Sequence, residues 1–188
     1  MKNLLFGLIA TVLFVNLGKA QNIEDLKSSK NPYKDKGEQL FQSLHKLADD
    51  LESKKITKES LESYLINNNL KKTHKLNDKD LILVQNYFKS NQLSVANSIK
   101  LEQQLINDNK NDELLHYITD LTWSLYFVET FSSNTELRGS GPTRFERCID
   151  RCMVKELNSM NPVEVAFMVA GIPASVAQMV ASCAWDCW

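Results

Sequence analysis

The residue types best suited to bind a metal ion fall on two segments with helical spacing. His45 and Asp49 lie four residues apart on the first. On the second, Glu113, His116 and Asp120 follow one another at intervals of three and four. Such intervals place side chains on one face of a helix, and imidazole with carboxylate is a common ligand set for zinc. Two helices that each carry His-x-x-x-Asp could chelate one ion between them.

Other features of the sequence argue against a metal or catalytic site. Glu113-x-x-His116 has the spacing found in di-iron helical bundles, but a second such motif and further glutamates are lacking. His74, the third histidine, lies in the basic segment 71–75 and is expected to be solvated. The motifs of serine hydrolases, zinc proteases, nucleotide-binding loops and C-x-x-C redox sites do not occur. We therefore predict surface ion pairs at these positions, with no metal, no bound cofactor and no enzymatic activity.

The four cysteines form two pairs with identical spacing near the C-terminal end. They are Cys148-x-x-x-Cys152 and Cys183-x-x-x-Cys187. An even number of cysteines in a chain expected to be exported predicts disulfides. A spacing of four places each pair on one face of a helix, one turn apart. Residues 143–146 read Thr-Arg-Phe-Glu, a capping box that predicts the start of the first of these helices.

Four cysteines allow three connectivities, and the expected helix lengths favour one of them. The two helical arms between the cysteine pairs are about equally long, roughly 12–14 Å each. If the last helix runs antiparallel to the first, the pairs meet at the open end; if it runs parallel, they cannot bond. We therefore predict Cys152–Cys183 and Cys148–Cys187, with a short lid helix over 162–170.

Residues 144–188 resemble the twin C-x-x-x-C helical hairpins of small mitochondrial intermembrane chaperones and of plant hairpin defence peptides. The resemblance rests on the four cysteines and their spacing. It implies the geometry of a stapled helical hairpin, and it implies no particular activity.

The first twenty residues fit a cleaved secretory signal peptide. Lys2 precedes an uncharged apolar run over 4–17, which is shorter than the roughly 20 apolar residues of a membrane span. Gly18 and Ala20 supply the small residues that signal peptidase prefers, so cleavage is expected before Gln21. The protein is therefore predicted to be secreted or periplasmic.

The charge balance argues against nucleic acid as a partner. The chain has 22 Lys and Arg against 23 Asp and Glu, and loss of Lys2 and Lys19 with the signal peptide leaves 20 against 23. Proteins that bind nucleic acid carry a strongly basic face. The chain also has only six glycines and four prolines, and its apolar residues recur with helical period, which predicts an all-α fold.

Helical periodicity divides the mature chain into two parts joined by a linker. An irregular N-terminal helical bundle is expected over 21–131, a linker over 132–143 and the disulfide-stapled module over 144–188. The segment 112–131 is apolar on two faces, which is typical of a buried central helix. Other helices are expected over 35–53, after Thr57, after Asn77 and over 93–106.

The last helix carries a second apolar face, made of small residues and tryptophans, that we interpret as an interaction surface. Alanines let another helix approach closely, and tryptophan adds a large buried area. The expected partner is the N-terminal bundle, with Trp123 and Phe127 as receiving side chains, or else an unknown protein or a membrane surface. The residues of this face are Ala174, Ala177, Ala181, Trp185 and Trp188.

The leading functional hypothesis is an exported, non-catalytic helical protein that acts by binding in the cell envelope or the extracellular space. The alternative is a precursor that releases a bacteriocin-like or toxin-like C-terminal peptide by cleavage near Arg138 or Arg144. Residues 144–188 carry four basic and five acidic residues, whereas membrane-active peptides are usually basic, so the first hypothesis is favoured. A hydrolase or metalloenzyme is the third possibility.

Overall fold

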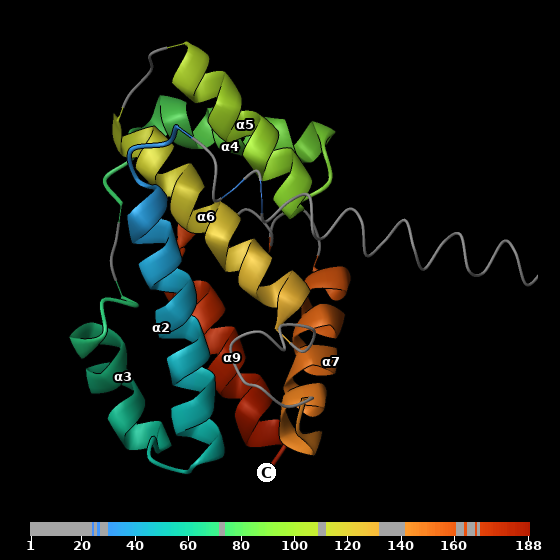
Figure 1. Ribbon diagram of the computed structural model, residues 1–188. Helices are drawn as coiled ribbons and strands as arrows, with labels where there is room; N and C mark the ends of the chain where they lie inside the picture. Colours follow the sequence, from blue (N-terminus) through green and yellow to red (C-terminus); the bar gives the residue numbers. More distant parts are fainter. Residues whose placement is uncertain are drawn as a thin grey trace, which may run out of the picture.

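The computed structural model describes residues 30–71, 74–108, 112–131, 142–160 and 170–188, together with Glu24, Leu26, Glu164 and Met168. These residues form helices and no strands, so the predicted all-α fold is confirmed for this part of the chain (Figure 1). No helix within it combines the length and apolar character that a membrane crossing needs. The helices are α2 (Lys34–Glu52), α3 (Lys58–Asn67), α4 (Asp78–Ser90), α5 (Val95–Asn107), α6 (Asp112–Thr130), α7 (Arg144–Ser159) and α9 (Ala174–Asp186).

Most helices begin at a residue whose side chain caps the first turn. Thr57 and Thr143 each form a reciprocal capping box, the second with the predicted partner Glu146. Asn77 caps α4 and Ser94 caps α5 by accepting a backbone N–H three residues ahead. These bonds satisfy N–H groups that have no partner inside the helix, and each is worth about 1 kcal/mol. Local side-chain chemistry therefore fixes where these four helices start.

Helix α6 is the central helix of the molecule, as predicted from its two apolar faces. Every residue from Leu114 to Val128 is buried. Figure 1 shows α6 crossing the molecule diagonally, with α2 along one side and α4 and α5 above its upper half. Helices α2 and α5 make the most extensive contacts with α6, and α7 touches it as well. A helix in this position carries any polar side chain on its surface into the interior.

The contact between α2 and α6 is closest at Gly37, which faces the indole ring of Trp123. A methyl group at Gly37 would overlap that ring. One turn further along α2, Phe41 packs edge-on against Trp123 and Phe127 with centroid distances of 5.9 and 6.3 Å. Glycine at position 37 thus lets the two helices approach across a large aromatic side chain.

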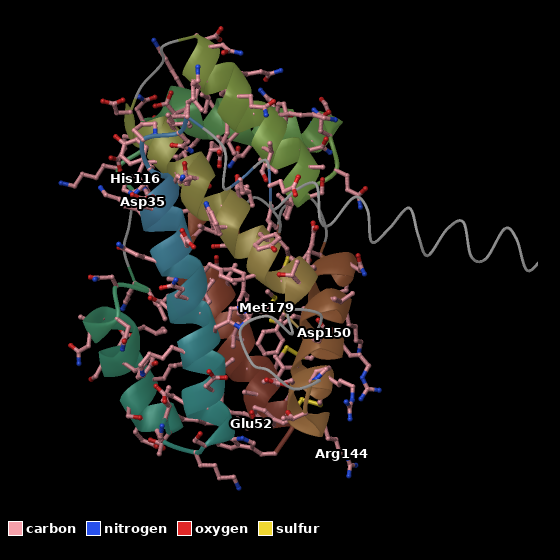
Figure 2. The ribbon with its side chains drawn as sticks, viewed as in Figure 1. Asp35, Glu52, His116, Arg144, Asp150 and Met179 are labelled. Atoms are coloured by element: carbon pink, nitrogen blue, oxygen red, sulfur yellow. A yellow bond between two sulfur atoms is a disulfide. The ribbon has the colours of Figure 1, made fainter. Side chains whose placement is uncertain are left out.

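The C-terminal hairpin holds both predicted disulfides. Cys148 is bonded to Cys187 and Cys152 to Cys183, with Cα–Cα distances of 5.9 and 5.6 Å. The bonds join α7 to α9, and Figure 2 shows their sulfur atoms between these two helices, far from His116. Disulfides of this kind form in oxidising compartments. The antiparallel course deduced from the cysteine spacing is therefore present in the structure.

Helix α9 also packs along α2, which makes the hairpin part of the same core as the N-terminal helices. At the end of this contact the Thr143 hydroxyl donates to a carboxylate oxygen of Glu52 at 2.9 Å. Lys54 and Lys58 lie over the rings of Trp188 and Trp185 at 5.5 and 5.2 Å. The two segments separated by the predicted linker are thus in direct contact.

Three predicted features fall outside the described residues. They are the signal peptide at 1–20, most of the linker at 132–143, and most of the lid helix at 162–170. In the lid segment the structure describes Glu164, Met168 and Ala170, all of them helical.

Candidate metal centre

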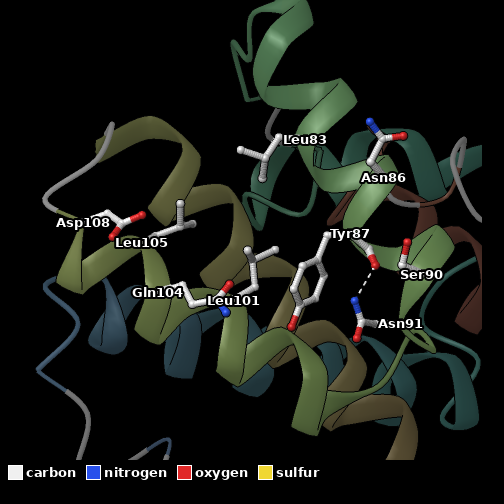
Figure 3. Close-up of a pocket in the computed structure, with 9 residues that line it drawn as sticks. All are labelled: Leu83, Asn86, Tyr87, Ser90, Asn91, Leu101, Gln104, Leu105 and Asp108. Carbon is white, nitrogen blue, oxygen red and sulfur yellow. Dashed lines mark hydrogen bonds between the residues drawn. The ribbon is translucent and has the colours of Figure 1, made fainter.

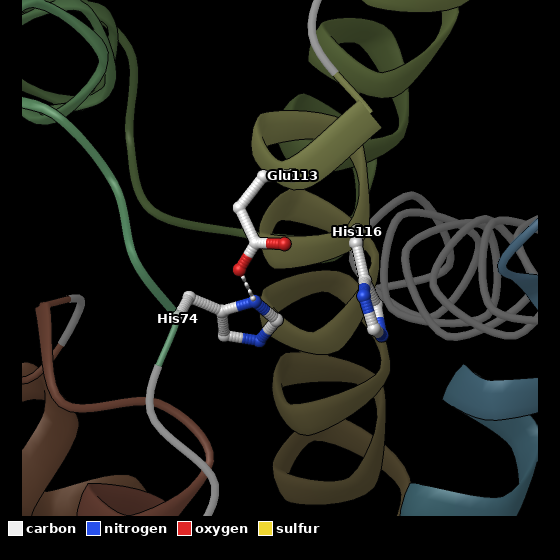
Figure 4. Close-up of side chains that lie close together, drawn as sticks. All are labelled: His74, Glu113 and His116. Atoms are coloured by element: carbon white, nitrogen blue, oxygen red, sulfur yellow. Dashed lines mark ion pairs between the residues drawn. The ribbon is translucent and has the colours of Figure 1, made fainter.

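Helix α6 places Glu113, His116 and Asp120 on one face, and the loop between α3 and α4 adds His74. The Nδ1 atom of His74 lies 3.3 Å from Oε1 of Glu113, and its Nε2 atom lies 2.8 Å from Oδ2 of Asp120. His116 stands next to this pair, with a ring centroid 5.0 Å from that of His74 (Figure 4). One ligand atom from each of His74, Glu113 and His116 falls within 4.8 Å of the others.

The buried ring of His74 has a carboxylate oxygen opposite each of its nitrogens. Its side chain is 2% exposed, and the Nδ1 atom has no hydrogen-bond partner. A neutral imidazole carries one N–H, which here serves the shorter contact, from Nε2 to Asp120. The lone pair of Nδ1 then points toward the oxygen of Glu113. A metal cation between Nδ1 and Glu113 would satisfy both atoms.

The spacing of these atoms suits a metal ion. Two ligands of a tetrahedral zinc ion, each at about 2.0–2.1 Å, lie about 3.3 Å from one another. This is the distance between Nδ1 of His74 and Oε1 of Glu113. Two imidazoles and one carboxylate form the ligand set of open zinc sites, in which the fourth position takes a water or an exogenous ligand. The cluster can therefore hold a divalent transition metal with three protein ligands.

Asp120 would then orient His74 and leave coordination to the other residues. It is 4% exposed, and its Oδ2 atom accepts the Nε2–H of His74. A carboxylate on the far nitrogen fixes the tautomer of a metal-binding histidine and makes it a stronger ligand. Burial raises the pKa of the Glu113 carboxyl, but the N–H of Lys75 and the ring of His74 outweigh this effect and hold that pKa below its ordinary value. Glu113 thus stays a carboxylate that can bind a cation.

The ring of His116 is held in place by Tyr33, which precedes α2. The two rings are stacked, with centroids 4.4 Å apart and planes 4° from parallel. The backbone N–H of Tyr33 donates to the side-chain oxygen of Asn31 at 2.9 Å. The amide nitrogen of Asn31 in turn donates to Glu102 at 3.0 Å and to Thr119 at 2.7 Å. A buried polar network therefore anchors the segment that covers His116.

Glu102 is the acidic member of this network and lies between α5 and α6. It is 3% exposed, and its Oε2 atom accepts the hydrogen bond from Asn31. Burial raises the pKa of the Glu102 carboxyl, and the hydrogen bond from Asn31 offsets part of that effect. The interior around Asn31 is thus polar.

His45 and Asp49, the other predicted ligand pair, do not join the cluster. The ring of His45 packs among Phe41, Phe127 and Phe131 with centroid distances of 4.6, 4.9 and 5.7 Å. Asp49 is exposed to solvent on α2. The two His-x-x-x-Asp pairs therefore do not form one site, because His45 is buried among aromatic rings and Asp49 is exposed to solvent.

The expectation that His74 is solvated is wrong, and so is the assignment of His116 and Asp120 to surface ion pairs. The basic residues around His74 suggested an exposed turn, but the loop folds its ring against α6. One signal in the sequence could have indicated this contact. Residues 112–131 were predicted to be buried all round, so the polar groups of His116 and Asp120 need a partner from another segment. His74 is the one histidine outside the two predicted helical segments.

The predicted interaction surface on α9 is largely internal. Ala177 and Ala181 have no exposed area, and α9 packs on α2 and α7. Trp185 is partly buried and Trp188 is 49% exposed at the end of the helix. Helix α9 makes its most extensive contacts with α2 and α7, while Trp123 and Phe127, the expected receivers on α6, pack against Phe41 of α2.

Among the hollows on the described surface, two bear on function. One, of ≈ 560 Å³, lies between α4 and α5 and is lined by apolar side chains such as Leu83, Leu101 and Leu105 (Figure 3). Asp108 is the one carboxylate among its described lining residues. The other hollow, of ≈ 360 Å³, is lined by His116 and Asp120 of the cluster. The second hollow thus reaches His116 and Asp120 from the surface, whereas His74 and Glu113 do not line it.

No protein family, curated protein or solved structure matches this chain.

Proposed function

We propose that this protein is exported and acts by binding a divalent transition metal ion, of which zinc fits best, without catalysing a reaction. The observation that carries the proposal is the convergence of His74, Glu113 and His116 to within 4.8 Å, with Nδ1 of His74 facing the Glu113 carboxylate. Zinc accepts nitrogen and oxygen ligands in tetrahedral geometry. It also undergoes no redox change, which suits an oxidising compartment.

Export is supported by the two disulfides and by the sequence of residues 1–20. Binding to another protein through α9 has less support, because Ala177 and Ala181 are covered inside the molecule. Release of a C-terminal peptide has less support for a related reason. Helix α9 packs along α2, so cleavage in the linker would leave the hairpin attached to the N-terminal helices.

The test is a zinc titration of untagged protein by isothermal calorimetry, since a histidine tag would itself bind the ion. We expect one zinc per chain. Glu113→Gln should abolish tight binding while disturbing the fold least, because this side chain is 43% exposed. His74→Gln should also abolish it.

His45→Phe is the matched control. It removes the third histidine and keeps an aromatic ring among Phe41, Phe127 and Phe131, so zinc binding should be unchanged. If wild-type protein binds no zinc, or if the Glu113 variant binds it equally well, the cluster is not a zinc site and the proposal is wrong.

A further inference from the structure

The hollow beside the cluster has the size and the lining of a site for a small polar molecule. Its ≈ 360 Å³ falls near the lower end of the range of small-molecule sites, about 300–1,000 Å³. His116 and Asp120 form one wall. Helix α2 contributes Lys36 and Ser43 to the lining, and the turn after α3 contributes Asn69. A molecule in this hollow would touch the cluster directly.

Of the two charged side chains that line the hollow, one has a close partner of opposite or complementary character and the other has no ion pair with the described residues. Lys36 and Asp120 are the two charged side chains among the described residues that line the hollow. Asp120 already accepts a hydrogen bond from His74. Lys36 has no ion pair within the described part of the chain, and its ammonium lies 5.3 Å from the centroid of Tyr33, the ring that stacks on His116. The hollow therefore offers a positive charge close to the cluster.

We infer that this hollow binds a small polar carboxylate, of the size of an amino acid or a hydroxy acid. The inference rests on the proposed metal site, because three protein ligands leave the fourth tetrahedral position for an exogenous ligand. One carboxylate oxygen would occupy that position, and the Lys36 ammonium would neutralise the charge of the ligand. Ser43 and Asn69 supply neutral hydrogen-bonding groups for the rest of the molecule, which favours a polar acid over a fatty acid.

The test uses the full mature chain loaded with Co²⁺, whose visible absorption spectrum reports the coordination of the ion. The probe is lactate, a small hydroxy acid, and the neutral control is lactamide. We expect lactate to change the spectrum and lactamide to leave it unchanged. Lys36→Gln should weaken the probe about tenfold at unchanged Co²⁺ affinity, as expected for loss of one charged contact. Lys79→Gln, an exposed lysine on α4, should alter neither.

The possible failures are distinguishable. If Co²⁺ binds and lactate leaves its spectrum unchanged, the carboxylate site is wrong and the metal site stands. If the probe binds the Lys36 variant as tightly as the wild type, the hollow does not recognise the anion and the inference is overturned. If Co²⁺ does not bind at all, the proposed function fails and the carboxylate site fails with it.

Discussion

The C-terminal hairpin and the histidine cluster are held together in opposite ways. In the hairpin, two covalent bonds join α7 to α9 at positions that repeat every four residues. In the cluster, His74 comes from a loop and meets α6 through noncovalent contacts at 3.3 and 2.8 Å. The helical repeat determines which cysteines meet in the hairpin. The path of the loop between α3 and α4 determines where His74 lies in the cluster. One region should therefore depend on redox conditions, and the other on protons and metal ions.

The largest effect should follow removal of both disulfides. Replacing all four cysteines with serine frees loops spanning 31 and 39 residues, which should lower the free energy of unfolding by about 3–4 kcal/mol. Chemical denaturation measures this loss. Zinc affinity should be unchanged, because the cluster shares no residue with the hairpin.

The matched variant for this experiment is the double change Cys148→Ser and Cys187→Ser. It leaves Cys152–Cys183 in place, so a loop of similar length remains closed and the loss should be much smaller. A loss as large as that of the four-serine protein would show that the bonds act through local packing instead of loop closure.

The next effect should come from zinc. At a free zinc concentration roughly 100-fold above the dissociation constant, binding to the native state should add about 2.7 kcal/mol to the free energy of unfolding. Thermal melts with zinc and with a chelator measure the difference. The four-serine protein should gain as much as the wild type, whereas Glu113→Gln should gain nothing. A zinc effect that disappears with the cysteines would mean that the two regions are coupled.

A substitution at Gly37 should have a smaller effect on stability, through the contact between α2 and α6, which no disulfide holds together. Gly37→Ala adds a methyl group against the indole ring of Trp123, which is 2% exposed and has little room to move. Overpacking of this kind costs about 1–3 kcal/mol, more than the helix propensity gained from alanine. Urea denaturation measures the loss, with Gln42→Ala on the exposed side of α2 as the control. An unchanged midpoint would show that α2 and α6 can separate without cost.

The smallest effect should be a change in the pH dependence of stability, caused by Glu102. Because burial raises the pKa of this carboxyl above its ordinary value of 4.5, the native state holds the proton more tightly than the unfolded state. The contribution of Glu102 is therefore complete below pH 4.5 and is lost as the pH rises through the native pKa. Glu102→Gln should flatten the stability profile above pH 4.5. Equal slopes in wild type and variant would contradict the assignment.

The sequence predicted the parts of the fold that depend on local chemistry. Thr143 and Glu146 form their capping box, and the two cysteine pairs are bonded as helix geometry required. Helix α6 is buried as its two apolar faces indicated. Each of these conclusions uses residues that are close in the sequence, or pairs constrained by a regular helix.

The candidate site was only half predicted, because one ligand comes from outside any periodic segment. Glu113, His116 and Asp120 share a helix face, and the sequence shows this directly. His74 reaches them from a loop. Loops have no regular repeat, so the position of a loop side chain cannot be predicted from its spacing in the sequence. The misplacement of His45 has the same origin, since helical spacing gives a face but not the neighbour that covers it. Tertiary packing decided both outcomes.

The contact between α2 and α9 bears on the order in which the molecule can fold. These helices lie near opposite ends of the described sequence, yet each covers apolar surface of the other. Helix α9 is the last of the described helices to be synthesised. Until it is present, the apolar stripe of α2 that includes Leu44, Leu47 and Leu51 stays partly exposed to solvent. Contacts between such distant segments slow folding and expose incomplete intermediates to aggregation. If the protein is exported as proposed, its chain would cross the membrane unfolded and complete its core afterwards, when oxidation of the cysteines makes the closure permanent.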